Sequence, residues 1–146
     1  MKVKVINAFS VEEFDVQLEK IKNEIRPTLA IIFCSVKHDL YKISSLGKKY
    51  GFEIFGASSS GEIMNDEIFE YSITAMLLDI SPEYFRTHFT KNNVASTYED
   101  AKKALQFGRE QFQKPGFIVA ASGILRDGED IVDPFVDYQT EFVPLF

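Results

Sequence analysis

A continuous apolar run over residues 28–36, TLAIIFCSV, is the feature that most constrains the fold of this chain. A strand with one wet face alternates polar and apolar residues, and this run does not, so it predicts a strand covered on both faces. Before the run, residues 14–25 carry apolar side chains at helical spacing, and residues 2–9 alternate with the period of a strand. The alternation of strand and helix patterns predicts an α/β (α+β) protein with a mixed β-sheet.

The same reasoning along the whole chain predicts the element order β-α-β-α-β-β-β-α-β-α, with helices packed on the sheet. Capping boxes, in which a hydroxyl and a glutamate satisfy free backbone N–H groups, mark helix starts at Ser10–Glu13 and Ser96–Glu99. Gly51 is placed to end the second helix in the left-handed conformation. The segment 84–90 alternates and is predicted to pair antiparallel with its neighbour. The predicted strands cover residues 2–9, 28–36, 52–57, 71–80, 84–90 and 117–122.

Composition limits the partners and the location of the chain. Its 146 residues favour one domain, and 16 Lys and Arg against 22 Asp and Glu give a formal net charge of −6. An acidic protein repels nucleic acid and anionic membrane surfaces, so we expect neither as a partner. The single cysteine, Cys34, lies in the apolar run and is expected to be a buried structural thiol. The sequence has no signal-peptide pattern and no bilayer-length apolar run, so we expect a cytoplasmic protein.

The stretch GASSSGEI, residues 56–63, follows the third predicted strand and is the candidate site. Ligands of α/β proteins usually bind at strand ends. Backbone N–H groups and serine hydroxyls could hold a carboxylate there, and Glu62 could hold an ammonium. This pairing suits a zwitterion such as an amino acid, and it suits a phosphate badly. The alternative interpretation is structural, with serines that cap the next segment and a Glu62 that caps an N–H.

Two other functions could use the same stretch. Residues 57–61 approach the G-x-S-x-G motif of serine hydrolases, but Ala57 replaces the first glycine. The histidine base that should follow the serine could only be His88, because His38 precedes the motif. A phosphate-binding P-loop needs a lysine that this stretch lacks, and Glu62 would repel the phosphate. A non-catalytic ligand pocket is therefore the main hypothesis, and a serine-dependent hydrolase is the alternative.

Acidic residues gather in the last quarter of the chain, at Asp127, Glu129, Asp130, Asp133 and Asp137. Their spacing fails the EF-hand pattern, which needs a glycine at its sixth position. Two histidines and one cysteine far apart make no zinc signature. The acids are typical of a helix N-terminus, with Asp133 as the cap and Pro134 at the first helical position. The sequence therefore predicts no metal and no cofactor.

Two segments also carry a resemblance to a known family. EIFGASSSGEI followed by EYSITAMLLDI resembles the N-terminal half of the FIST family, sensory domains of prokaryotic signalling proteins whose turn has the pattern G-x-S/T-x-x-G-E. FIVAASGILRDGED resembles a later strand and loop of that family. The matching positions are Gly56, Ser58, Gly61 and Glu62 in the first segment and Ser122, Gly123, Asp127 and Gly128 in the second. The resemblance covers residues 3–146.

The resemblance implies one FIST N-terminal-like sensory domain over residues 1–146, which binds a small ligand such as an amino acid and is not itself catalytic. In the family a G-G-x-A-G-D stretch and a C-terminal half follow, so we expect a truncated chain that works with a missing C-terminal half or an output module. A further alternative is a structural domain that pairs through its C-terminal strand, for example as a homodimer. The expected ligand-binding residues are Gly56, Ser58, Ser59, Ser60, Gly61, Glu62, Ser122, Gly123 and Asp127.

Overall fold

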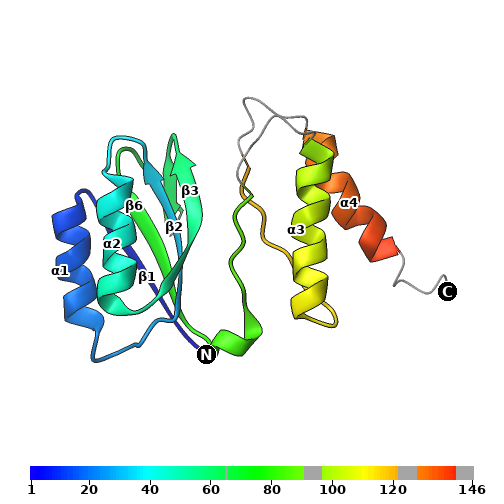
Figure 1. Ribbon diagram of the computed structural model, residues 1–146. Coiled ribbons are helices and arrows are strands. Elements are labelled where there is room, and N and C mark those ends of the chain that lie inside the picture. Colours follow the sequence, from blue (N-terminus) through cyan, green and yellow to red (C-terminus); the bar gives the residue numbers. More distant parts are fainter. Residues whose placement is uncertain (65, 91–96, 122–127, 141–146) are drawn as a thin grey trace. The chain divides into compact units, whose positions relative to one another are not determined.

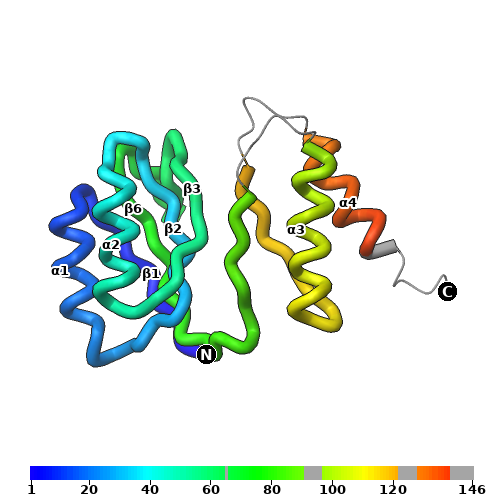
Figure 2. Tube along the Cα trace, in the orientation of Figure 1, coloured from blue at the N-terminus to red at the C-terminus, as the bar shows by residue number. Residues whose placement is uncertain are grey.

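The computed structural model describes residues 1–64, 66–90, 97–121 and 128–140. The chain divides into two compact units, Met1–Thr87 and His88–Phe146 (Figure 1). Within the described residues, the first unit contains the strands and two helices, and the second contains two further helices. Figure 2 traces the same path along the backbone. This mixture of helices and a mixed sheet confirms the predicted fold class.

The first unit is built from β1 (Lys2–Ala8), α1 (Val11–Ile21), β2 (Leu29–Ser35), α2 (Leu40–Tyr50), β3 (Glu53–Ser59), β4 (Glu62–Met64), β5 (Glu67–Phe69) and β6 (Ile73–Asp79). Four of the strands form a sheet in the spatial order β1-β6-β2-β3. β2 and β3 are parallel, whereas β6 runs antiparallel to both β1 and β2. The strands β4 and β5 form a separate short hairpin. The sheet is therefore mixed, as the sequence predicts.

Local sequence signals set the helix ends. The Oγ of Ser10 accepts a hydrogen bond from the N–H of Glu13 at 3.0 Å, and the Glu13 carboxylate accepts one from the N–H of Phe9 at 2.8 Å. The predicted capping box thus starts α1. Asp39 caps α2, since its carboxylate accepts hydrogen bonds from the first turn of that helix. Gly51 ends α2 with a φ of +78°, in the left-handed conformation predicted for it.

The core of the first unit lies between the sheet and its two helices. Helices α1 and α2 lie side by side on one face of the sheet (Figure 1). Phe14 of α1 is completely buried against that face, and Cys34 of β2 is buried there as predicted. The core consists of Ile6, Ala8, Phe14, Leu18, Ile21, Ile25, Ala30, Ile32, Cys34, Ile43, Leu46, Phe52, Ile73, Ala75 and Leu77.

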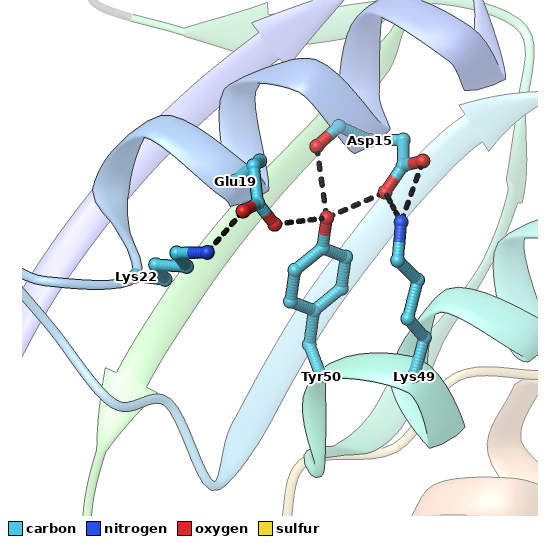
Figure 3. A network of polar contacts seen from close by, with 5 residues as sticks. All are labelled: Asp15, Glu19, Lys22, Lys49 and Tyr50. Atoms are coloured by element: carbon cyan, nitrogen blue, oxygen red, sulfur yellow. Dashed lines mark hydrogen bonds and ion pairs between the residues drawn. The ribbon is translucent and has the colours of Figure 1, made fainter.

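A polar network joins α1 to α2 at the edge of this core (Figure 3). The Nζ atom of Lys49 lies 2.7 and 2.8 Å from the two carboxylate oxygens of Asp15, and the Tyr50 hydroxyl donates to one of them at 2.6 Å. The Tyr50 hydroxyl also lies 3.3 Å from the carboxylate of Glu19. The hydrogen bonds from Lys49 and then Tyr50 hold the pKa of Asp15 below its ordinary value. The network therefore links the two helices through side-chain contacts.

The other face of the sheet is less well covered. Along β2 the side chains alternate, and Phe33 is 41% exposed although its neighbours Ile32 and Cys34 are buried. Val5 of β1 and Met76 of β6, which pair across the sheet, are each 41% exposed. Within the first unit, β2 is therefore buried on one face, contrary to the expectation from its apolar run. The reason is that both helices of this unit pack on the same side.

The second unit contains α3 (Thr97–Gln111) and α4 (Gly128–Thr140). The ring of Phe117 lies 4.9 Å from the ring of Phe135 in α4. Gly108 of α3 leaves space for Phe117, because a Cβ atom at position 108 would lie 2.4 Å from the ring. Phe117 thus packs between the two helices. Among the described helices, none has the length and the apolar character needed to cross a bilayer.

Two predicted strands are absent from the described residues. Residues 84–90 form no strand, and a 3-10 turn at Pro82–Tyr84 precedes an irregular segment. Their neighbour β6 is already paired with β1 on one side and β2 on the other, so it has no free edge for them. Residues 117–121 are irregular as well, and Ile118 is 70% exposed. In this segment Phe117 packs between α3 and α4, and residues 117–121 do not join a sheet.

The start of α4 also differs from the prediction. The helix begins at Gly128, so Pro134 lies inside it and Asp133 is not its cap. A proline inside a helix has no N–H to donate, so one i→i−4 hydrogen bond is missing there. Glu129 and Asp130 do lie in the first turn, where the macrodipole favours acidic residues.

Candidate functional site

The GASSSGEI stretch lies at the end of the edge strand β3 and continues into the β4–β5 hairpin. β3 ends at Ser59, Ser60 and Gly61 make the connection, and β4 begins at Glu62. Because β2 and β3 are parallel, with Ser35 paired with Ser59, the stretch lies at the carboxyl edge of these two strands. This is the edge at which ligands usually bind in α/β sheets.

The two glycines of the stretch have different roles. A Cβ atom at Gly56 would lie 1.8 Å from the carbonyl oxygen of Ile32, so only glycine allows β3 to approach β2 this closely. At Gly61 the nearest atom to such a Cβ, in Ile68, would be 3.8 Å away, which is ordinary contact. Gly56 is therefore needed for the sheet, whereas the fold imposes no steric demand for glycine at position 61.

The carboxylate of Glu62 is the buried centre of the stretch, with its residue only 1% exposed. Its Oε1 atom accepts a hydrogen bond from the Ser59 hydroxyl at 2.7 Å. Its Oε2 atom accepts two hydrogen bonds from Ser72, one from the hydroxyl at 2.9 Å and one from the backbone N–H at 3.1 Å. Glu62 therefore joins the end of β3 to the residue just before β6.

The hydrogen-bond network continues from Ser72 to β1 and α1. The side-chain amide nitrogen of Asn7 donates to the Ser72 hydroxyl at 3.0 Å and to the Thr74 hydroxyl at 2.8 Å. The side chain of Gln17 donates to the backbone oxygen of Asn7 at 2.7 Å. Ser72 is completely buried, so this network holds the candidate site to the interior of the first unit.

The network also determines the charge of Glu62. Burial raises the pKa of its carboxyl group, but the hydrogen bonds from Ser59 and Ser72 and the charge of His38 outweigh burial and bring the pKa below its ordinary value. Glu62 is therefore ionised at neutral pH. Burial, and then the negative charge of Glu62, raise the pKa of the Cys34 thiol. Cys34 therefore stays protonated, as expected for a structural cysteine.

Tyr71 adds a strained backbone position to this region. Its φ is +61°, in the left-handed region that only glycine, asparagine and aspartate visit readily. The Nε2 atom of His38 lies 2.9 Å from the Tyr71 carbonyl oxygen, and the Nζ atom of Lys37 lies 3.3 Å from the centre of the ring. His38 and Lys37, in the segment after β2, thus both contact Tyr71, the residue before Ser72. Strain of this kind often marks functional sites.

Sequence reasoning missed Asn7, Tyr71 and Ser72 as parts of the site. Of these three, only Asn7 carries a signal in the sequence. Val3, Val5 and Asn7 are alternate residues of one strand, and Asn7 is polar where the first two are apolar. The contacts of Ser72 and Tyr71 arise because β6 lies beside β2 in the sheet, a topology that no local pattern encodes.

The remaining predicted site residues fall into two groups. Ser58 and Ser60 are exposed, and Ser59 is half-buried. Ser122, Gly123 and Asp127 lie outside the described residues. The structure thus brings Ser59 and Glu62 into contact and leaves two further serines at the surface beside them.

The geometry gives the catalytic alternative little support. The ring of His38 contacts the Tyr71 carbonyl, and His88 stacks on Phe107 in the second unit with the ring centres 4.5 Å apart. In the described residues, neither histidine makes a hydrogen bond to a serine of the stretch. The described part of the chain also holds no group of three or more side chains suited to a metal ion.

A separate hollow of about 500 Å³ lies at the opposite end of β3. It is lined in part by Phe52, Glu53 and Ile54 at the start of β3, and by Lys48 of α2. The hollow is open and includes no residue of GASSSGEI, so it is distinct from the candidate site.

Comparison with known proteins identifies the family of the chain. The model of the FIST N domain family matches residues 28–146, which include the whole GASSSGEI stretch, the first unit from β2 onward and the second unit. Comparison with curated proteins and with solved structures gave no match. The FIST family is generally a sensory domain of signal-transduction proteins and is not known for catalysis. Since the match covers most of the sequence, this chain belongs to the FIST N domain family.

Proposed function

We propose that this chain is the small-ligand-binding part of a signal-transduction protein, that it is not an enzyme, and that its ligand is an amino acid or a similar small metabolite. Family membership supports the sensory part of this proposal. The position of the GASSSGEI stretch at the carboxyl edge of β2 and β3 supports the place of binding. We place the ligand against Ser58, Ser59 and Ser60, with Ser122, Gly123 and Asp127 as the further predicted contacts.

The observation that carries the proposal is the buried, ionised carboxylate of Glu62. A buried charge is costly unless hydrogen bonds satisfy it, and here three hydrogen bonds from Ser59 and Ser72 do so. A turn fastened in this way holds the neighbouring serines in place before a ligand arrives. Such preorganisation lowers the entropic cost of binding. In this proposal Glu62 holds the site in its folded arrangement and acts on the ligand only through Ser59.

Thermal unfolding in the presence of single amino acids and common metabolites tests the proposal. A ligand at a hundred times its Kd is expected to stabilise the protein by about 2.7 kcal/mol. The double variant Ser58→Ala/Ser60→Ala should lose this stabilisation. The variant Ser45→Ala, which alters an exposed serine of α2, should keep it. If no compound raises the Tm, or if both variants respond like the wild type, the proposal is wrong.

A second candidate function is an interaction domain. The observation that favours it is the position of β3 at the edge of the sheet, where an edge strand can accept a further strand. In this case the chain would associate with a second copy or with another part of a longer protein, without any ligand. Light scattering over a range of concentrations distinguishes the two functions, because association that no metabolite alters favours the interaction domain.

A further inference from the structure

The hydrogen bonds around Glu62 have a defined direction. An ionised carboxylate can only accept hydrogen bonds, so the hydroxyls of Ser59 and Ser72 must both donate to it. The amide nitrogen of Asn7 can only donate, and it donates to the Ser72 oxygen at 3.0 Å. The hydroxyl protons of Ser59 and Ser72 therefore both point toward one negative charge, that of Glu62.

As a result, the Ser59 hydroxyl cannot donate a hydrogen bond to a ligand. A serine hydroxyl has one proton and two acceptor lone pairs, and the proton of Ser59 is used in the 2.7 Å bond to Glu62. Ser59 is only half-buried, so part of the residue is open to solvent. The exposed hydroxyls of Ser58 and Ser60 make no hydrogen bond with the described residues, so they keep both roles.

We infer that Ser59 is a specificity-determining residue that accepts a hydrogen bond from a primary ammonium group and rejects carboxylates and phosphates. The inference rests on the proposed function, because it assumes that a ligand reaches this turn. The negative charge of Glu62, directly behind the Ser59 oxygen, reinforces the preference for a cation. It also reverses the arrangement that the sequence suggests, in which the serines hold a carboxylate and Glu62 itself contacts the ammonium.

Three probes of three carbon atoms each separate the possibilities: L-alanine, propylammonium and propionate. Titrations are followed by the NMR shifts of the backbone N–H groups of Ser59, Ser60, Gly61 and Glu62 in the intact chain. L-Alanine and propylammonium should shift these signals in a saturable way, and propionate should not. Ser59→Ala should weaken the binding of propylammonium about tenfold or more, because a hydrogen bond to a charged group is lost.

The variant Glu62→Gln provides a sharper test. Its side-chain amide can donate to the Ser59 oxygen, which frees the Ser59 proton to point outward, and the negative charge is gone. The preference should then invert, so that propionate shifts the signals and propylammonium does not. A residue with a merely structural role would not cause this inversion. Glu67→Gln, which changes an exposed carboxylate of the same hairpin, is the matched control and should behave like the wild type.

The outcomes distinguish a failure of the inference about Ser59 from a failure of the proposed ligand-binding function. If propionate binds the wild type at these signals, or if Ser59→Ala leaves propylammonium binding unchanged, the inference is overturned and the ligand site stands. If neither these probes nor the metabolite panel bind, the proposed function fails and the inference fails with it. Should Glu62→Gln not fold, the wild type and Ser59→Ala still decide between ammonium and carboxylate.

Discussion

Ser72 donates two hydrogen bonds to the same carboxylate oxygen of Glu62, from its hydroxyl at 2.9 Å and from its backbone N–H at 3.1 Å. These residues are ten positions apart, Glu62 at the start of β4 and Ser72 in the connection between β5 and β6, so the pair fixes the β4–β5 hairpin to the start of β6. A backbone N–H in a buried position needs such a partner, since leaving it unpaired is costly.

Removal of the Glu62 carboxylate should therefore destabilise the first unit. We expect Glu62→Ala to lower the free energy of unfolding by about 3 kcal/mol, because the Ser72 N–H is left buried without an acceptor. Glu62→Gln keeps one acceptor oxygen and should cost about 1–2 kcal/mol. Urea unfolding measures both values. Glu67→Ala, at an exposed position, is the control, and an equal loss in that variant would contradict the prediction.

The stability of the protein should fall in acid partly because of Glu62. Its pKa in the folded state lies below the value of about 4.3 typical of unfolded chains. The ionised group therefore stabilises the fold above that pH, and its contribution is lost as the pH falls through the folded pKa. Of the titratable groups nearby, His38 lowers the pKa of Glu62, and Glu62 in turn raises the pKa of the Cys34 thiol.

Urea unfolding of the wild type and of Glu62→Gln between about pH 7 and pH 3 measures this contribution. The free energy of unfolding should fall more steeply for the wild type. Asp15 also has a lowered pKa, so both proteins lose some stability in acid and only their difference reports on Glu62. Parallel curves for the two proteins would refute this assignment.

The close approach of β2 and β3 makes a prediction for Gly56. Alanine at this position would place its Cβ atom 1.8 Å from the Ile32 carbonyl oxygen, which the strands can relieve only by separating. We expect Gly56→Ala to cost about 3 kcal/mol or more, or to prevent folding. Gly61→Ala is the matched control, and it should cost about 1 kcal/mol or less because space is available there. Similar Tm values for the two variants would show that the approach is not rigid.

The left-handed backbone of Tyr71 predicts different changes in stability for two substitutions at this position. Tyr71→Gly relieves the left-handed strain but loses the contact with Lys37, so the two effects of about 1 kcal/mol each should nearly cancel. Tyr71→Val adds a β-branched side chain at a φ of +61° and should destabilise the protein by about 2 kcal/mol. Thermal unfolding compares them. Equal stability of the two variants would mean that the φ at this position is not held.

Several parts of the fold could be predicted from local sequence alone. The capping box at Ser10, the glycine at position 51 and the helical spacing from Phe14 each describe an interaction between residues a few positions apart. For that reason they hold whatever the rest of the chain does. The strand predictions at 84–90 and 117–121 were wrong because an apolar or alternating pattern shows only that a segment can be a strand. Whether it becomes one depends on its neighbours, and β6, the expected partner of 84–90, is already paired on both sides.

The same distinction between local sequence and tertiary contacts applies to the candidate site. The sequence by itself determined that two glycines, three serines and a glutamate follow a strand, and this was enough to locate the turn and to suggest polar chemistry there. Only the tertiary structure decided what Glu62 does. It brings Ser72 and Asn7 to the turn through the pairing of β6 with β1 and β2, and it buries the carboxylate among their hydrogen bonds. Burial and hydrogen-bond direction depend on contacts between distant segments, and these decide whether a charged group faces a ligand or orders the residues that do.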